Sequence, residues 1–308
     1  MNETPRMATT RPPTFRTAPW YSWATAVPRA LATPLWATAY TRRLGVHCLK
    51  DLSTQSWKRG DTAFIMGSGP SINDLTGQQW EIIRGGTTIG VNWWTKHDFV
   101  PDLYVFERLT DGPRQMLLSR AEDYANTPMI LKQCLTNFSP VIHRWRMELI
   151  SLLPKGLRSR LYLSSDLLVP GRTEEELRRA FRTAERLGFF RSRERFQWVV
   201  KRTSSLTFLI CLCVRAGFRD IVLCGVDLNR PGTFYDTKPT ASSNGLIHET
   251  QDPSVKVLPI SDVLRLLNDE VLRAKNERLF IANPTSRLAS FLPVYDWSQA
   301  IEPQGMSE

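Results

Sequence analysis

The sequence predicts an α/β fold with a Rossmann-like, mostly parallel sheet and helices on both faces, and three observations support this prediction. From residue 61 onward, apolar strand-like segments alternate with helix-like segments, a pattern typical of parallel sheets. The first strand-like segment runs directly into a glycine-rich turn. The segment 205–216 is apolar almost all round, as expected for a helix at the centre of a domain.

The first predicted strand, 62–66, leads into the turn Gly67-Ser-Gly-Pro-Ser71. Gly67 and Gly69 permit a tight or left-handed backbone and the close approach of a ligand. We expect a helix to open at Pro70 and Ser71, and the amides at its start would bind an anion such as a nucleotide phosphate. A turn without a ligand is the alternative, because the third glycine of the dinucleotide fingerprint and the Walker pattern are both absent.

The other elements follow from periodicity and capping signals. Thr173 and Glu176 form a capping-box pattern, which predicts a helix over 173–187. Ser204 or Ser205 would cap the apolar helix, and Gly217 lies where a terminating glycine belongs. The remaining predicted helices are 74–84, 113–124 and 261–275, and the remaining predicted strands are 87–92, 102–106, 128–132, 220–225 and 278–282.

The length of 308 residues is enough for one large domain with extensions. We expect a basic, Trp- and Pro-rich extension over 1–59, a domain over 60–300 with a lid at about 229–248, and a tail over 301–308. Five cysteines are spread along the chain, and no Cys/His spacing resembles a zinc site. This cysteine usage favours a reduced, cytoplasmic protein.

The net charge of +10 is concentrated at the amino terminus, where residues 1–60 hold nine Arg and Lys against two acidic residues. Prolines and Arg29 interrupt this segment before the ~20 apolar residues that a membrane span requires, and no secretory leader is evident. Aromatic residues mixed with arginines suit the anionic surface of a membrane. A basic tail packed on the protein itself is the alternative, and nucleic acid is not expected as a partner.

Several polar motifs lie at the ends of predicted elements. The second strand ends in Gly90-Val-Asn92, and Arg202-Thr-Ser-Ser205 opens the apolar helix. A later strand ends in Gly-Val-Asp227, and a polar stretch from Asn229 leads to His248. Near the carboxyl terminus, Asn283-Pro284 follows the last strand.

In order and spacing, these motifs resemble the bacterial sialyltransferases of glycosyltransferase family 42. The resemblance covers about residues 60–292 and is most specific over 202–227. It implies a GT-A-like domain that binds a CMP-activated sialic acid and transfers the sugar with inversion, without a metal or other cofactor. The acceptor would be a hydroxyl of a glycan or glycolipid, and relatives often assemble as tetramers.

The resemblance also implies roles for individual residues. His248 would be the general base, Arg202 would line the active site, and Tyr235 (or Phe234) would hold the departing phosphate. Imidazole suits the base because its pKa is near neutral, and a lid would exclude water that hydrolyses the donor. The donor would be bound by Gly67, Ser68, Gly69, Pro70, Ser71, Asn92, Ser204, Ser205, Asp227, Asn229 and Asn283.

The sequence also departs from the family pattern. Ser68 stands where the family usually has Asn, and Asn229 occupies the first of two lid positions that are usually Tyr. Glu107 stands where relatives often carry an amide or a hydroxyl. These differences leave open another nucleotide-activated acidic sugar as the donor.

Two other functions remain as alternatives. A diphosphokinase-type enzyme on the same fold would need acidic metal ligands near the first turn, for which Asp98 and Asp102 are the candidates. A non-catalytic protein would bind a membrane or nucleic acid through its amino-terminal segment and the basic block 186–202, and its binding would depend steeply on salt.

Overall fold

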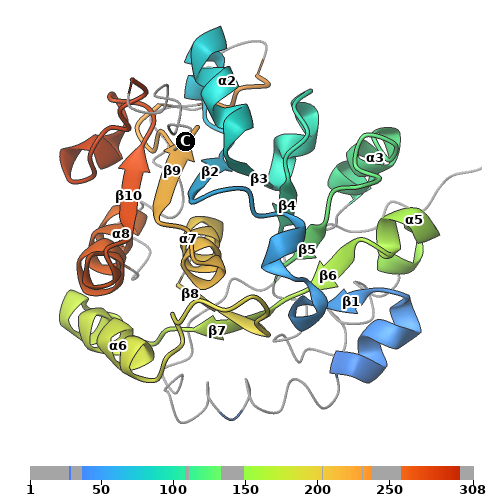
Figure 1. Ribbon diagram of the computed structural model, residues 1–308, viewed down its shortest axis with the longest axis horizontal. Coiled ribbons are helices and arrows are strands. Elements are labelled where there is room, and N and C mark those ends of the chain that lie inside the picture. The colour runs from blue at the N-terminus through green and yellow to red at the C-terminus, as the bar shows by residue number, and fades with distance from the viewer. Residues whose placement is uncertain are drawn as a thin grey trace, which may run out of the picture.

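A computed structural model describes residues 28, 37–107, 111–132, 149–202, 204–230, 232–236 and 258–298. Its main sheet has eight strands, all paired in parallel, in the order β1-β6-β5-β4-β3-β2-β9-β10 (Figure 1). This sheet confirms the predicted α/β class. Its strands are β1 (His47–Cys48), β2 (Thr62–Met66), β3 (Thr87–Val91), β4 (Leu103–Phe106), β5 (Met129–Leu131), β6 (Leu161–Leu163), β9 (Asp220–Cys224) and β10 (Arg278–Ile281).

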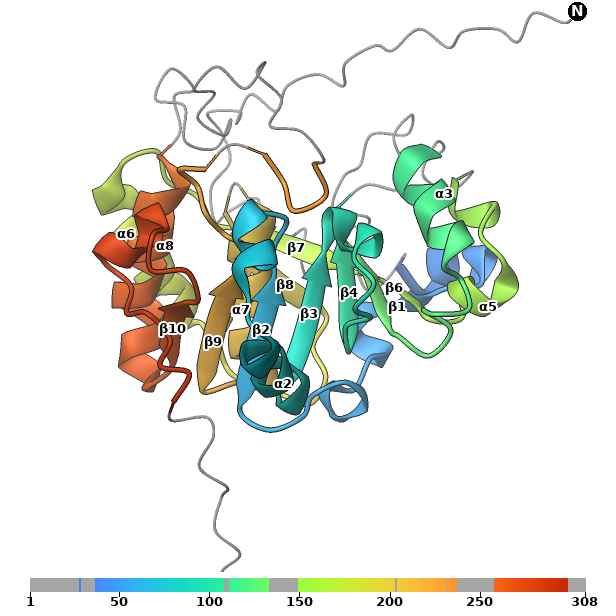
Figure 2. The ribbon, with the colours of Figure 1, turned by 90° about the horizontal axis from the view of Figure 1, so that it is seen from above.

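Helices cover both faces of the main sheet (Figures 1 and 2). Alternate residues of β2 point to opposite faces, so Ala63 and Ile65 join one apolar cluster while Phe64 and Met66 join the other. The first cluster is completed by α6 (Glu174–Arg186), α7 (Ser205–Ala216) and α8 (Ile260–Leu267). The second is completed by the helical residues 37–44, α2 (Gly77–Gly85), α3 (Asp111–Ser119) and α5 (Lys155–Arg158).

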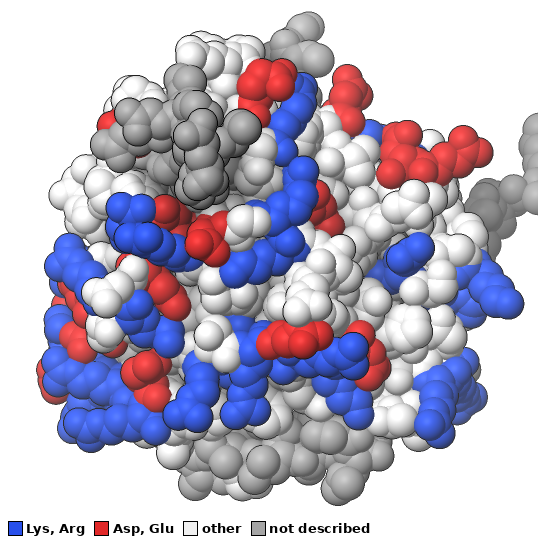
Figure 3. All heavy atoms as spheres, in the orientation of Figure 1, with Lys and Arg blue, Asp and Glu red and all other residues white. Residues whose placement is uncertain are grey.

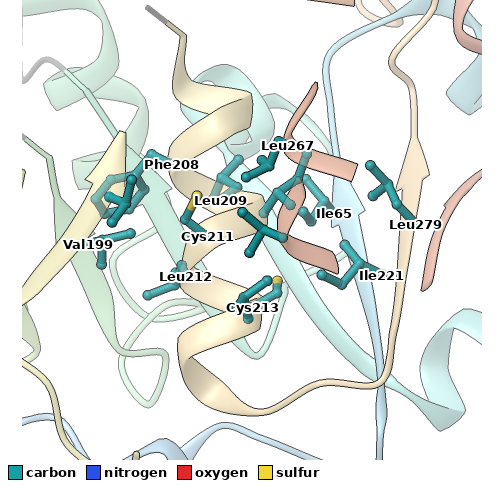
Figure 4. Packing of buried hydrophobic residues seen from close by; sticks show 14 of the residues in the cluster. Ile65, Val199, Phe208, Leu209, Cys211, Leu212, Cys213, Ile221, Leu267 and Leu279 are labelled. Carbon is teal, nitrogen blue, oxygen red and sulfur yellow. The ribbon is translucent and has the colours of Figure 1, made fainter. Parts of the chain in front are cut away.

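Helix α7 is the central element that its apolar sequence predicts. Every residue from Thr207 to Ala216 is buried, and the helix packs between β8 and the main sheet (Figure 4). The Ser204 side chain accepts a hydrogen bond from the Thr207 amide, and Gly217 ends the helix in the left-handed conformation. Both predicted capping signals are therefore confirmed, as is the capping box of Thr173 and Glu176 on α6.

The prediction that an α-helix opens at Pro70 and Ser71 is wrong. Residues Pro70–Asp74 make a short 3₁₀ turn, and Leu75 then returns to an extended conformation. Helix α2 begins only at Gly77, where Thr76 forms a capping box with Gln79. The glycine-rich turn therefore does not lead straight into an α-helix whose amides face a ligand.

The elements that sequence periodicity missed are short. Strands β1 and β6 have two and three residues, and β7 (Ser165–Leu168) pairs with β8 (Trp198–Lys201) in a separate two-stranded sheet. The predicted helix 261–275 begins at Ile260 but changes to a π-helical turn over Asn268–Leu272 and a 3₁₀ turn over Arg273–Lys275.

Part of the predicted amino-terminal extension belongs to the packed domain. Strand β1 pairs with β6, and Leu49, Leu52 and Trp57 lie in the core. The Lys58 ammonium donates to the carbonyl of Gly217 over 2.6 Å, so this basic residue caps the end of α7. Residues 1–27, 29–36 and 301–308 lie outside the described residues, and no described helix is long and apolar enough to cross a membrane.

Candidate functional site

The order of the strands places a reversal of chain direction at one point of the sheet. Strands β3 to β6 follow one another on one side of β2, whereas β9 and β10 lie on the other side. The chain therefore reverses its direction of travel across the sheet between β2 and β9. Ligands of open α/β sheets bind outside the carboxyl ends of the strands at such a reversal.

The first turn needs glycines because its backbone packs closely against the loop after β9. The Gly67 amide donates to Cys224 over 2.7 Å, and the Gly69 amide donates to Gly225 over 2.8 Å. A β-carbon on Gly67 would lie 2.5 Å from the carbonyl oxygen of Gly225. Neither glycine of the turn has a positive φ. Their small size is therefore explained by loop packing, and the approach of a ligand to this turn stays a prediction.

Asp227 joins three loops at this edge. Its carboxylate accepts the Ser71 amide over 3.0 Å and the Asn283 side-chain amide over 2.7 Å. Only 3% of Asp227 is exposed. The structure thus brings three predicted donor-binding residues together, bonded to one another. Nearby, the Asn229 side-chain amide donates to the Thr285 carbonyl over 2.8 Å.

The first described part of the predicted lid lies against the glycine-rich turn. The Phe234 amide donates to the Ser68 carbonyl over 3.0 Å, and the Phe234 ring packs on Trp94. The Lys96 ammonium lies 3.8 Å from the centre of the Tyr235 ring. Burial raises the pKa of Tyr235. Figure 2 shows this segment above the carboxyl ends of β2 and β3, whereas His248 lies outside the described residues.

Asn92 holds the carboxyl end of β3 in an unusual conformation. Its φ of 52° is in the left-handed region, which Asn tolerates better than most residues with a side chain. Its side-chain oxygen accepts the Glu107 amide over 3.3 Å, and its carbonyl accepts the Tyr104 hydroxyl. The predicted ligand-binding residue is therefore bonded directly to the end of β4.

A cluster of charged side chains lies at the carboxyl ends of β4, β5 and β8, and sequence reasoning missed most of it. The Lys132 ammonium donates to the Ser205 hydroxyl over 2.7 Å, and that hydroxyl donates to the Glu107 carboxylate over 2.9 Å. Lys201 lies 3.4 Å from Glu107 and 3.8 Å from Asp166. We call these five residues the lysine cluster.

The two lysines of the cluster are buried, but the cluster reaches the surface. The side chains of Lys132, Lys201 and Asp166 are 0%, 3% and 1% exposed, whereas 32% of the Glu107 side chain is exposed. Desolvation and the nearby Lys201 charge lower the pKa of Lys132 to about 7, although Glu107 and Asp166 oppose this shift. The described part of the site thus holds an amine that titrates near neutral pH.

Arg202 lies directly after β8 and points away from solvent. Its guanidinium donates to the Val169 carbonyl over 3.2 Å and to the Gly171 carbonyl. Burial lowers its pKa. In the described residues Arg202 therefore anchors the loop after β7, and its predicted role at the active site stays a prediction.

The block 186–202 contains both buried and exposed residues, and its basic residues Lys201 and Arg202 are buried. Phe190 and Phe196 are buried, whereas the arginines from Arg191 to Arg195 are exposed. On the neighbouring surface of α6 and α8, Figure 3 shows basic residues interspersed with acidic ones, and Glu270 pairs with both Arg178 and Arg182. This surface is mixed in charge rather than a continuous basic patch.

A hollow of about 400 Å³ lies at the opposite, amino edge of the sheet, lined in part by Trp57, Arg59 and Asp102. The carboxylate of Asp102 accepts the Thr88 amide over 2.8 Å and pairs with Arg59 over 2.6 Å. It lies at the start of β4, so Asp102 is remote from the first turn. This position does not suit the metal-binding role that the diphosphokinase alternative assigns to it.

Comparison with known proteins finds similar solved structures. No protein-family model and no curated protein matches the sequence. The monofunctional alpha-2,3-sialyltransferase Cst-I from Campylobacter jejuni is 15% identical with a TM-score of 0.45, over 77% of this chain and 81% of that chain. The sialyltransferase CstII from the same organism, in complex with the substrate analogue CMP-3FNeuAc, is 14% identical with a TM-score of 0.43, over 77% and 87%. At these values, function must be inferred from the residues of this chain.

Proposed function

We propose that this chain is an inverting glycosyltransferase that moves a sialic acid or a similar acidic sugar from a CMP-activated donor to a hydroxyl of a glycan or glycolipid. The supporting observation is the meeting of polar residues from separate strand ends at the carboxyl edge of the sheet. Asn92, Glu107 and Ser205 form one hydrogen-bonded group at the ends of β3 and β4 and the start of α7, and the first turn follows the neighbouring strand β2.

In the proposed reaction, one residue acts on the acceptor hydroxyl and other residues contact the departing phosphate. His248 would take the proton of the acceptor hydroxyl, as the family resemblance implies. Asn92, Ser205 and Tyr235 would contact the phosphate that departs with CMP, where charge develops in the transition state. No step in this scheme requires a metal, and the described residues contain no group of three His, Cys, Asp or Glu side chains placed to hold one.

The proposed cellular setting rests on the sequence. We place the enzyme in the cytoplasm at the inner face of the membrane, with basic residues among the first 60 contacting anionic lipid. Assembly into a homo-oligomer such as a tetramer belongs to the same proposal. Sedimentation with anionic vesicles and sedimentation velocity test these two points separately.

Thermal unfolding with nucleotides tests the donor. A ligand that binds only the folded state raises the melting temperature, so CMP should raise it with or without Mg²⁺. A shift that requires ATP and Mg²⁺ would support the diphosphokinase alternative instead. If CMP binds, release of CMP from CMP-sialic acid tests transfer, and His248→Ala should abolish this release without abolishing the thermal shift.

A further inference from the structure

The hydrogen bonds of the lysine cluster run from a buried donor to an acceptor near the surface. Lys132 is wholly buried and donates to Ser205, and Ser205 in turn donates to the partly exposed carboxylate of Glu107. Each donor therefore lies behind an acceptor that is closer to solvent. The last acceptor in this chain is an anionic oxygen at the carboxyl edge of the sheet.

We propose that Ser205, supplied with a proton by Lys132, donates to the departing phosphate of the donor, and that Glu107 occupies the position of that phosphate until the donor displaces it. This inference rests on the proposed function and deepens it. A phosphate oxygen accepts a hydrogen bond from a hydroxyl as a carboxylate oxygen does. The Glu107 side chain is partly exposed, so it has room to move aside.

The charged groups that face Lys132 come from the carboxyl end of β4 and from β7 and β8. Lys201 on β8 lies between two carboxylates, those of Glu107 and of Asp166 on β7. The ammonium of Lys132 lies 3.6 Å from Glu107 and 5.4 Å from the centre of the Phe208 ring. Burial and the Lys201 charge lower the pKa of Lys132, whereas Glu107 and Asp166 raise it.

The proposed step balances atoms and charge. The bond between the anomeric carbon and the phosphate oxygen breaks, and its electron pair stays on the oxygen. That oxygen takes the proton of the Ser205 hydroxyl while the Lys132 ammonium returns a proton to Ser205. The acceptor oxygen bonds to the anomeric carbon, and its own proton goes to the general base. A phosphate monoester has a second pKa of about 6, which is close to the pKa of about 7 of Lys132.

The first test is the pH dependence of CMP release from CMP-sialic acid. The wild-type rate should fall as the pH rises through about 7, because Lys132 then loses its proton. Lys132→Met should lower kcat by about 10²-fold and lack this fall, while CMP still raises its melting temperature. Lys155→Met is the matched control, because Lys155 is an exposed lysine on α5. A Lys132→Met enzyme that keeps the alkaline fall would overturn the relay.

The second test measures affinity and does not depend on turnover. Glu107→Gln removes the negative charge that competes with the phosphate, so this variant should bind CMP several-fold more tightly than the wild type. Equal or weaker binding of CMP by Glu107→Gln would contradict the displacement of Glu107. If the wild type binds no CMP and releases none from the donor, the proposed function itself fails. If the wild type is active but Lys132→Met keeps the alkaline fall, or Glu107→Gln does not bind CMP more tightly, the proposed relay fails and the proposed function stands.

Discussion

Replacing Lys132 by Met, which is similar in length but uncharged, should change how stability depends on pH. Burial lowers the pKa of Lys132 from its usual 10.5 to about 7. Between these two pH values the unfolded chain binds a proton that the folded protein has largely lost. The wild type therefore gains stability relative to Lys132→Met as the pH rises through this window.

The size of the effect follows from the same two values. The full difference corresponds to about 5 kcal/mol, which is an upper bound for a side chain that interacts with several charges. From pH 7.5 to 9.5, the free energy of unfolding of the wild type should rise by about 2 kcal/mol relative to the variant. Urea denaturation at each pH measures this difference, with Lys155→Met as the control. A difference that is constant or falls over this range would refute a lowered pKa for Lys132.

Three further predictions concern the loops at the carboxyl edge, each measured by urea denaturation. Gly67→Ala should destabilise by about 2 kcal/mol or more, because its β-carbon would lie 2.5 Å from a backbone oxygen, whereas Gly77→Ala on α2 meets open space and should not destabilise. Equal effects of the two would contradict the packing role of the turn. Asp227→Ala should cost about 2 kcal/mol, because the Ser71 amide loses its acceptor, and a neutral result would mean that water replaces the carboxylate. Asn92→Ala should cost about 1 kcal/mol and Asn92→Gly less, since alanine is disfavoured at a φ of 52°; the reverse order would count against this conformation.

The strands that are buried on both faces could be predicted from the sequence. The strands that form only by pairing with a neighbouring strand could not. Strands β2, β3 and β9 are runs of apolar residues, so the pattern alone indicates them. Strand β1 has only two residues and becomes a strand because it meets β6. Strand β7 contains the buried Asp166, which no apolar pattern could identify.

The candidate site was predicted where residues follow one another along the chain and missed where the fold brings them together. Asn92 and Ser205 stand at the ends of predicted elements, which is a local signal. Lys132 ends a predicted strand, and a lysine at the end of an apolar strand was the one available indication of a buried charge. Lys201 belongs to the basic block 186–202, and its burial is not predictable from the sequence because it depends on contacts with β7 and α7.

The lysine cluster is better explained by function than by stability. Removing two ammonium groups and the Asp166 carboxylate from water costs free energy that their mutual attraction rarely offsets in full, and apolar residues of similar volume often stabilise a core more. This cost would be the same anywhere in the interior. The cluster nevertheless lies at the carboxyl edge of the sheet, connected to solvent through Glu107 and Ser205. α/β sheets bind their ligands at this edge. Burial of a lysine here lowers its pKa toward neutral, as a residue that exchanges protons with a ligand requires.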